Sequence, residues 1–486
     1  MEKSSIEDCP LKPYRIGLLI LAGLLIALSW WGIFSARSGL IVRSLNQEGV
    51  PLLYLAPKSL RAVPGVLVAH GYSGSKQLML SYGHVLARSG YAVMLWDWDG
   101  HGANPSRLQD GSLRRNFGTA WNAIAQQPEV DATRLAVLGH SMGSGAVMDA
   151  AILHPGDFSA TIAVSPTGAK VTPDRPRNLQ IQAGSWEGGF IRNAERILQQ
   201  AGGSNSDVAN GRGREFILVP NVEHITILFN SVSHNAARQW LDRTFGAQQQ
   251  SQYVDRRMLW QAVHLIGWLI GLAAIMPSLQ IVTTPISISP LQRWGGLLLS
   301  STVPTAGLVL LDRVTDLQTL GGVQVGGAIA LWFLLAGLIW LIVLRQIPQF
   351  NLKKLMLGIG VFTVLWIAVG AMAQLVWLQS VLIPVRLEVW GMIAIASLPW
   401  FLATEIAQSK QRAVWGIAQS VALIGGFILV LQFLPQLGFM FLLLPLFPVL
   451  LTVLSIVAAQ VREQWSVAIA SALFFAWLLA AGFPLA

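Results

Sequence analysis

The second half of the chain is a series of long apolar segments, and these limit its possible folds more than any other feature. Eight such segments follow about residue 257, each roughly 20 residues long and separated by short polar joints. A segment of this length can cross a bilayer, and it must be helical because lipid offers its backbone polar groups no other partners. The sequence therefore predicts an all-α, multi-span membrane domain over residues 251–486. The segments lie near residues 258–280, 294–311, 321–344, 355–378, 387–406, 413–434, 437–458 and 464–484.

A further apolar segment lies near the N-terminus, at residues 16–34. A cleaved signal peptide would require a small side chain where Phe34 stands. We therefore predict that residues 1–37 form a cytoplasmic tail and an uncleaved membrane anchor. The resulting count of nine spans depends on Pro435, where two apolar segments are joined with almost no loop.

The distribution of positive charge predicts the orientation of the chain. Its net charge is +9, and Lys and Arg are concentrated before the first span and in alternate short loops. Such residues are enriched on the cytoplasmic side, so residues 38–250 and the C-terminus are expected on the opposite side, as in a bacterial inner-membrane protein. The residues on the predicted cytoplasmic side are Lys3, Lys12, Arg15, Arg293, Arg345, Lys353, Lys354, Lys410, Arg412 and Arg462.

Composition argues against several other classes of protein. Only 12% of the residues are charged, whereas soluble proteins have about 25%. No basic run is interleaved with aromatic residues, so nucleic-acid binding is not expected. The single cysteine, Cys9, cannot form an internal disulfide or a cysteine-based zinc site. No metal or cofactor is expected.

Residues 38–250 have a different pattern, in which short apolar runs alternate with helix-like stretches. The runs are apolar throughout and are bounded by Gly, Pro, Asp or Ser. Strands of this kind are buried on both faces, as in a parallel sheet covered by helices on both sides. The sequence therefore predicts an α/β domain with a doubly wound, mostly parallel sheet. Four such runs lie near residues 66–69, 91–95, 135–138 and 160–164, and two further strands are expected near residues 179–182 and 216–220.

The segment GHSMG at residues 139–143 is the most specific local motif. It follows the predicted strand at 135–138 and precedes a helix-like stretch at 145–152. This is the G-x-S-x-G pattern of a nucleophile elbow, in which a sharp turn raises Ser141 above the sheet. The glycines are needed because side chains at their positions would collide with the neighbouring strand and helix.

With this motif, residues from about 40 to 247 resemble the α/β-hydrolase superfamily of serine hydrolases. Residues 68–73 (VAHGYS) resemble the loop that supplies half of the oxyanion hole in that family. Residues 97–102 (DWDGHG) resemble its Asp-x-x-Gly-His-Gly turn. The resemblance implies a catalytic triad in the chain order Ser, acid, His.

The resemblance also implies roles for residues around the elbow. Ser141 is the expected nucleophile, and the backbone N–H groups of Tyr72 and Met142 are the expected donors of the oxyanion hole. His70, Gly71 and His140 are expected on the substrate-binding side, where the histidines belong to segments that shape the site.

The acid is expected after the strand at 179–182. The family usually has Asp three residues after the glycine that stands here as Gly184, and this chain has Glu187. A longer side chain must fold back to reach the histidine. A surface glutamate at a helix start is the alternative interpretation, and Asp174 and Glu195 are weaker candidates for the acid.

The base is expected after the last strand, and His224 stands there. His234 is the competitor, although it falls inside or just before the closing helix. His84 and His154 are expected at the surface or at helix ends.

The site is expected to have no large cap. Only about fifteen residues separate Ser165 from the next strand, which is enough for a loop. The membrane, the spans or a partner would then supply the missing wall. Leu78, Met79 and Leu80 with Tyr72 form either an apolar rim or part of the core.

The membrane domain has no chain of ionisable residues near mid-span, so an anchor or scaffold is favoured over transport. Gln374 is a polar residue within a predicted span and is explained most simply by a helix–helix hydrogen bond. Together the features predict a membrane-anchored serine hydrolase that cleaves carboxylic esters, with a lipid or other acyl substrate, through Ser141, His224 and Glu187. A peptidase or acyltransferase is the nearest alternative, and a transporter or scaffold with a ligand-binding hydrolase-like domain is the other.

Overall fold

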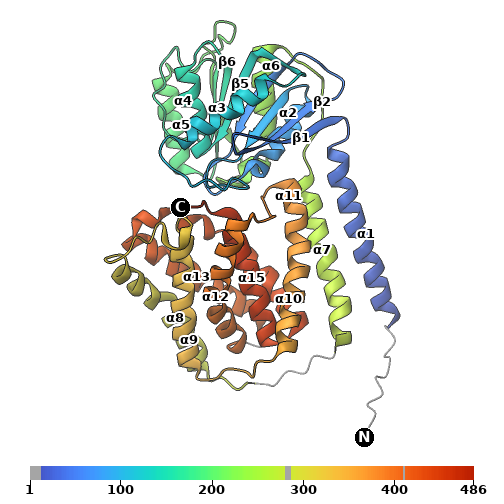
Figure 1. The fold of residues 1–486 in the computed structure, drawn as a ribbon, viewed down its shortest axis with the longest axis vertical. Helices are drawn as coiled ribbons and strands as arrows, with labels where there is room; N and C mark the ends of the chain where they lie inside the picture. Colours follow the sequence, from blue (N-terminus) through green and yellow to red (C-terminus); the bar gives the residue numbers. More distant parts are fainter. Residues whose placement is uncertain (1–11, 280–285, 409–410) are drawn as a thin grey trace. The chain divides into compact units, whose positions relative to one another are not determined.

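The computed structural model describes residues 12–279, 286–408 and 411–486 (Figure 1). Lys3, Cys9 and Lys410 lie outside the described residues. The chain forms two compact units. The sheet unit comprises Trp31–Trp260, Met372–Ile383 and Ala481–Ala486. The helical unit comprises the residues up to Trp30, Gln261–Ala371 and Pro384–Ala480.

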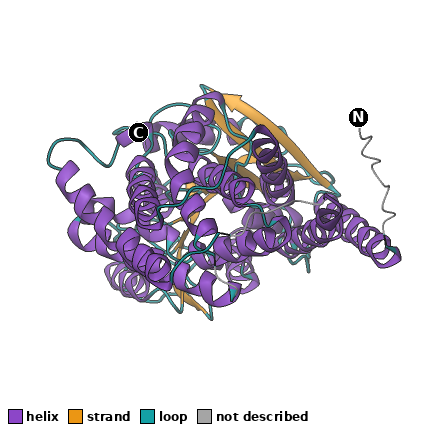
Figure 2. Cartoon of the chain, turned by 90° about the horizontal axis from the view of Figure 1, so that it is seen from below, coloured by secondary structure: helices purple, strands orange, loops and turns teal. Residues whose placement is uncertain are grey.

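The sheet unit is built on one eight-stranded sheet, whose strands are orange in Figure 2. The strand order is β1-β2-β4-β3-β5-β6-β7-β8. The strands β3 to β8 run parallel to one another, and β2 runs antiparallel to both β1 and β4. Their bounds are β1 Leu40–Gln47, β2 Val50–Pro57, β3 Val63–Ala69, β4 Ala92–Trp96, β5 Val130–His140, β6 Phe158–Val164, β7 Leu179–Gly184 and β8 Arg214–Val219.

Helices cover both faces of this sheet. Helices α2 and α6 pack on one face, and α3, α4 and α5 pack on the other. Val66 and Val68 of β3 belong to the core under α2 and α6, whereas Leu67 belongs to the core under α3 and α4. The continuous apolar strand is therefore buried on both faces, and the predicted α/β doubly wound fold is confirmed. The helices are α2 Leu80–Arg88, α3 Ser112–Ala125, α4 Met142–Leu153, α5 Gly188–Gln200 and α6 Ser231–Phe245.

The hairpin formed by β1 and β2 was not predicted from the sequence. Its two turn residues, Glu48 and Gly49, both have positive φ angles of 52° and 80°. This backbone matches the right-handed twist of the paired strands and is the commonest two-residue hairpin turn. The prediction that no cap follows β6 agrees with the structure, in which no helix or strand lies between Val164 and Leu179.

In the helical unit and its flanking segments, eight helices of the described residues are long and apolar enough to cross a membrane. A ninth span results if Pro435–Leu443 and Leu446–Val461, which are bent by 43° at their junction, are counted as one. The number of spans thus depends on the segment that begins at Pro435, the position on which the count from the sequence also depends. The orientation of the spans stays a prediction. One of the eight spans, Leu352–Val376, contains both α10 and α11, and α14 belongs to the bent pair. The individual helices of these segments are α1 Pro13–Ala36, α7 Arg257–Ile275, α8 Pro290–Leu311, α9 Gly326–Leu344, α10 Leu352–Trp366, α11 Met372–Val376, α12 Pro384–Ile406, α13 Arg412–Phe433, α14 Leu446–Val461 and α15 Gln464–Gly482.

Candidate active site

A sharp turn joins the end of β5 to the start of α4 and carries Ser141. The serine has φ 52° and ψ −121°, a backbone conformation that costs a non-glycine residue about 1–3 kcal/mol. A Cβ atom at Gly139 would lie 2.3 Å from the carbonyl oxygen of Gly143, and one at Gly143 would lie 2.5 Å from that of His70. Both contacts are with backbone, which cannot move aside, so the turn requires glycine at both positions.

The side chains of Ser141, His224 and Glu187 form one hydrogen-bonded chain. Nε2 of His224 lies 3.1 Å from Ser141 Oγ, and Nδ1 lies 2.7 Å from Glu187 Oε1. The Glu187 side chain is 2% exposed and that of His224 is 13% exposed. The structure thus brings together the three residues predicted from the sequence, with the imidazole between the hydroxyl and the carboxylate.

The longer side chain of Glu187 folds back toward the end of β7, as expected for a glutamate that reaches the histidine from this position. Its Oε2 atom accepts hydrogen bonds from Gly184 N–H at 2.6 Å and from Ser165 Oγ at 2.9 Å. These donors satisfy one carboxylate oxygen and leave Oε1 facing His224. Sequence reasoning missed Ser165, although it directly follows β6 and so lies at the same edge of the parallel sheet as Glu187.

Two rings hold the imidazole of His224. Phe190 stacks on it with ring centroids 4.3 Å apart. The ring of His140 lies 4.6 Å away, and its Nε2 atom lies 2.9 Å from the carbonyl oxygen of His224. Phe190 was not predicted from the sequence, because nothing in its position on an amphipathic helix distinguishes it from a core residue.

The alternative residues lie elsewhere. Asp174 and Glu195 are exposed, in the loop after β6 and on α5 respectively. His234 is buried in α6, where its Nε2 atom lies 2.7 Å from the carbonyl oxygen of Leu228. That ring is satisfied by the backbone and is not part of the hydrogen-bonded chain with Ser141.

One expectation about the remaining histidines was wrong. His84 is not at the surface: it is buried in α2, with Nδ1 3.0 Å from the carbonyl oxygen of Leu80, and burial lowers its pKa to about 3. The cause is that most of α2 is covered, so its polar residues are enclosed as well. His154 follows α4 and is exposed, as expected. Leu78, Met79 and Leu80 are core residues rather than an exposed rim.

The predicted oxyanion segment, residues 68–73, covers the end of β3 and the start of the loop that follows it, and this loop contacts the elbow. We call residues 70–79, from the end of β3 to the start of α2, the oxyanion loop. A Cβ atom at Gly71 would lie 2.9 Å from His140 Nδ1 and 3.0 Å from the Cβ atom of Ser141. Met142 is the first residue of α4, and the first N–H groups of a helix have no acceptor within it. The structure therefore places the loop containing Tyr72 and the start of α4 beside the serine.

Comparisons with known proteins agree with this architecture. Residues 61–207 match the family described as serine aminopeptidase, S33. The chain contains an α/β-hydrolase domain.

The relatives of the hydrolase domain match only part of the chain. An uncharacterized protein of Mycobacterium tuberculosis (strain H37Rv) is 30% identical over 112 residues, which are 23% of this chain and 40% of that protein. Cutinase est2 of Thermobifida alba is 28% identical over 116 residues, which are 23% of this chain and 37% of the cutinase. The crystal structure of dienelactone hydrolase from Anabaena variabilis is similar with a TM-score of 0.32 and 16% identity, over 42% of this chain and 97% of that one.

Within the hydrolase domain, a buried ion pair fixes the oxyanion loop. The Lys76 ammonium group pairs with the Asp97 carboxylate, and their side chains are 9% and 0% exposed. Asp97 also accepts hydrogen bonds from Lys76 N–H at 2.7 Å and from Ala103 N–H at 2.8 Å. The carboxylate therefore ties the loop after β3 to the turn after β4.

His70 is the first residue of the same loop, and its side chain is fully buried. Its Nδ1 atom lies 2.7 Å from the carbonyl oxygen of Gly71, and Nε2 accepts from Trp98 N–H at 3.3 Å. One ring nitrogen must donate and the other must accept, so these contacts fit the neutral ring. Burial lowers the pKa of His70 to about 4, which also keeps it neutral. Like His140, His70 is enclosed and shapes the site from below.

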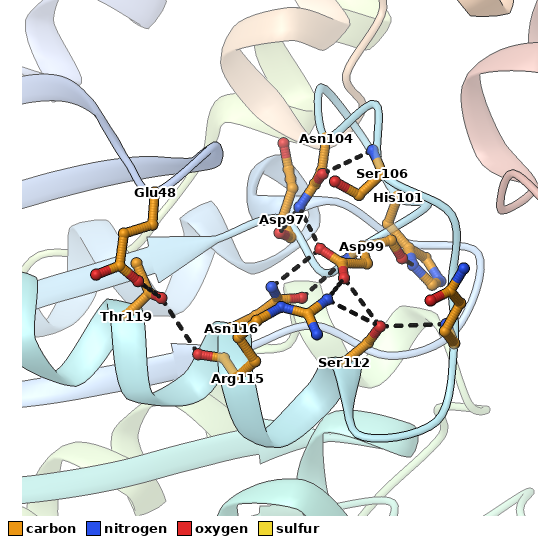
Figure 3. A network of polar contacts seen from close by, with 11 residues as sticks. Glu48, Asp97, Asp99, His101, Asn104, Ser106, Ser112, Arg115, Asn116 and Thr119 are labelled. Carbon is orange, nitrogen blue, oxygen red and sulfur yellow. Dashed lines mark hydrogen bonds and ion pairs between the residues drawn. The ribbon is translucent and has the colours of Figure 1, made fainter.

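A second carboxylate of the hydrolase domain, Asp99, fixes the turn after β4 to α3 (Figure 3). It accepts hydrogen bonds from Ser112 Oγ at 2.8 Å and from Nδ2 of Asn104 and of Asn116 at 3.0 Å each, and it pairs with the Arg115 guanidinium group. The DWDGHG segment thus contains two structural carboxylates, one for the oxyanion loop and one for α3.

Proposed function

We propose that the chain is a membrane-anchored serine hydrolase that cleaves carboxylic esters of lipids or other acyl compounds. The observation that carries the proposal is the hydrogen-bonded chain of Ser141, His224 and Glu187 at the elbow of an α/β-hydrolase domain. The same arrangement of hydroxyl, imidazole and carboxylate activates serine on several unrelated folds.

In the proposed reaction, Nε2 of His224 takes the proton of Ser141 Oγ as the oxygen attacks the ester carbonyl carbon. The C–O bond to the alcohol then breaks, and the alcohol leaves with the proton from His224. Water, deprotonated by the same imidazole, hydrolyses the acyl-enzyme and releases the acid. The carboxylate of Glu187 holds the ring in the tautomer that accepts at Nε2 and stabilises its protonated form.

The oxyanion of each tetrahedral intermediate is proposed to bind the backbone N–H groups of Met142 and Tyr72. Met142 supplies the positive end of α4, where anions are stabilised. One such donor contributes about 3–4 kcal/mol of transition-state stabilisation in other enzymes.

An ester is the favoured substrate because a relative of the hydrolase domain, at 28% identity, is described as a cutinase. The description of the matching family as serine aminopeptidase favours amide cleavage as the second candidate. The apolar helices and the charge distribution support a substrate at the outer surface of a bilayer.

Hydrolysis assays on the purified full-length protein test the proposal. The substrates are short and long p-nitrophenyl esters, a phospholipid ester and an aminoacyl anilide. Turnover of an ester that is lost in Ser141→Ala supports the proposed function. Turnover of the anilide alone would favour the peptidase, and no turnover of any substrate would contradict both.

A further inference from the structure

Two segments from the far end of the sequence belong to the sheet unit. They are Met372–Ile383, which separates α10 from α12 in the chain, and Ala481–Ala486 at the C-terminus. We call the first the connecting segment; its helix α11 is labelled in Figure 1. Trp377 of this segment packs against the core cluster that includes Leu78 and Met79 of the oxyanion loop.

Gln379 of the connecting segment is hydrogen-bonded to the oxyanion loop. Its Oε1 atom accepts from Gln77 Nε2 at 2.7 Å, and its backbone N–H donates to Ser75 Oγ at 3.2 Å. Ser75, Gln77 and Gln379 are 1%, 3% and 7% exposed. These are enclosed hydrogen bonds between residues about 300 positions apart, and such bonds restrict a loop more than exposed ones do.

Gln379 is itself held by its own segment. Its Oε1 atom also accepts from Gln374 Nε2 at 3.1 Å, and its Nε2 atom donates to the carbonyl oxygen of Val381 at 2.9 Å. The expectation of a helix–helix hydrogen bond at Gln374 was therefore wrong. Gln374 lies near the end of α11, and its Oε1 atom accepts from Ser380 N–H at 2.8 Å, so it serves to shape the connecting segment.

The C-terminus contacts the turn on the other side of the oxyanion loop. Leu485 N–H donates to the carbonyl oxygen of Gly100 at 2.8 Å, and Leu485 is 2% exposed. The ring of His101 in that turn lies 5.7 Å from the ring of Tyr72. The loop with the predicted oxyanion donor is therefore supported by both segments, directly by Gln379 and through the turn by Leu485.

The support matters because an oxyanion hole works by preorganisation. Its donors must lie about 2.7–3.1 Å from the developing oxyanion before the reaction begins. Ser75 follows Tyr72 by three residues, and Gly74 N–H donates to the carbonyl oxygen of Gly71 at 3.2 Å within this tight loop. A displacement at Ser75 or Gln77 is therefore transmitted to Tyr72.

We propose that Gln379 is a positioning residue for the oxyanion hole. It holds Ser75 and Gln77, and through them the Tyr72 N–H group, in the geometry that stabilises the tetrahedral intermediate. The connecting segment, Met372–Ile383, is then a working part of the hydrolase domain. The inference rests on the proposed function of Ser141.

The test uses the full-length protein with Gln379→Leu, Gln77→Leu and the double variant. Leucine keeps the side-chain volume and removes the side-chain hydrogen bond between Gln379 and Gln77, whereas the backbone N–H of residue 379 can still donate to Ser75 Oγ. Gln180→Leu is the matched control, because Gln180 is a buried glutamine of β7 whose Nε2 atom donates to Glu215 Oε2 at 2.9 Å and to the carbonyl oxygen of Ala236 at 3.1 Å. Active sites are titrated with a fluorophosphonate, so that kinetic constants refer to folded enzyme only.

We expect Gln379→Leu to lower kcat per titrated site about tenfold to hundredfold with KM unchanged, which is part of the 10²–10³-fold effect of losing one oxyanion donor. The affinity for a trifluoromethyl ketone, whose adduct carries an oxyanion, should fall by the same factor, and the pH profile should not move. Gln77→Leu should lower kcat by a similar factor. The double variant should have a kcat no lower than that of either single variant, because both substitutions remove the same side-chain hydrogen bond.

A wild-type kcat per titrated site in both single variants would overturn the inference, and so would a loss no larger than that of Gln180→Leu. If Gln379→Leu does not fold, Gln77→Leu decides alone. A wild-type protein that the fluorophosphonate does not titrate would instead contradict the proposed function.

Discussion

At the scale of single residues, the proposed acid is a glutamate at a position where the family that the domain resembles usually has aspartate. Glu187 reaches His224 with one oxygen while the other accepts two hydrogen bonds, from Gly184 N–H and Ser165 Oγ. The extra methylene is therefore accommodated by an anchor at the end of β7. The position of Glu187 could be predicted from the strand before it, but the anchor could not, because it joins ends of strands that only the folded sheet brings together.

Glu187→Gln should lower kcat about 10³–10⁴-fold, because the amide can present its NH₂ group to Nδ1 and favour the wrong tautomer of His224. Glu187→Asp should retain more activity than Glu187→Gln, because aspartate keeps the negative charge and only shortens the side chain by one methylene group. Ester hydrolysis per titrated active site measures both. Equal activity of Glu187→Gln and wild type would remove Glu187 from the proposed triad.

The buried His70 predicts a dependence of stability on pH. Burial lowers its pKa to about 4, from the ordinary value of 6.5 for histidine in an unfolded chain. The charge of Asp97 opposes this shift in pKa, and that of Lys76 adds to it. Well above pH 6.5 the His70 ring is neutral in both the folded and the unfolded state, so its full contribution to the free energy of unfolding is present. Between pH 6.5 and 4 only the unfolded chain binds the proton, so the free energy of unfolding falls by about 1.4 kcal/mol per pH unit.

Urea unfolding of the wild type and His70→Gln at several pH values between 7 and 4 measures this slope. In His70→Gln, the free energy of unfolding should depend less steeply on pH, because the contribution of His70 is lost. The contributions of the other buried histidines should remain. An identical slope in the two proteins would show that His70 is protonated equally in both states.

At the scale of secondary-structure elements, the strands that were predicted best are those buried on both faces. Apolar runs mark β3, β4, β5, β6 and β8, because helices cover both sides of the sheet, whereas β7 alternates apolar residues with the buried Gln180 and Gln182. The β1–β2 hairpin was missed, since its signal is confined to Glu48 and Gly49 at the turn. The site was predictable where a motif fixes the backbone, as at Ser141. It was not predictable where an ordinary helix residue such as Phe190 meets the site only after folding.

At Gly143, helix α4 packs so closely against β3 that one added methyl group should have a strong effect on stability and activity. A Cβ atom at Gly143 would lie 2.5 Å from the carbonyl oxygen of His70 and 2.7 Å from that of Ala69. Gly143→Ala should therefore push α4 away from β3, destabilise the domain by about 1–3 kcal/mol and displace Met142 N–H. Gly189→Ala on α5, where nothing lies within 4 Å, is the matched control.

Thermal unfolding and ester hydrolysis of both glycine variants check this expectation. The control should keep wild-type activity and stability. Wild-type behaviour of Gly143→Ala would mean that the elbow has more room than its geometry indicates.

At the scale of the whole molecule, the apolar segments predicted the number of long helices closely, because lipid permits few alternatives. They could not predict that Met372–Ile383 and Ala481–Ala486 belong to the sheet unit. Both segments are short and apolar or uncharged, so by composition they continue the neighbouring spans. The hydrogen bonds of Gln379 to Gln77 and of Leu485 to Gly100 distinguish the two segments from those spans.

The charge distribution predicts the side of the membrane on which the hydrolase domain lies. In a Cys9→Ser background, a cysteine at the exposed Glu195 should react with a membrane-impermeant maleimide in intact cells. A cysteine at the exposed Lys353, in a predicted cytoplasmic loop, should react only after permeabilisation. The reverse pattern would place the domain in the cytoplasm.

The proposed role of Ser141 as the nucleophile of the hydrolase domain underlies all of these expectations. Its most direct test is to treat the full-length protein with a fluorophosphonate and to map the adduct by mass spectrometry of its peptides. We expect one adduct, on Ser141, and no labelling of Ser141→Ala. An adduct on a different serine, or equal labelling of Ser141→Ala, would show that Ser141 is not the nucleophile.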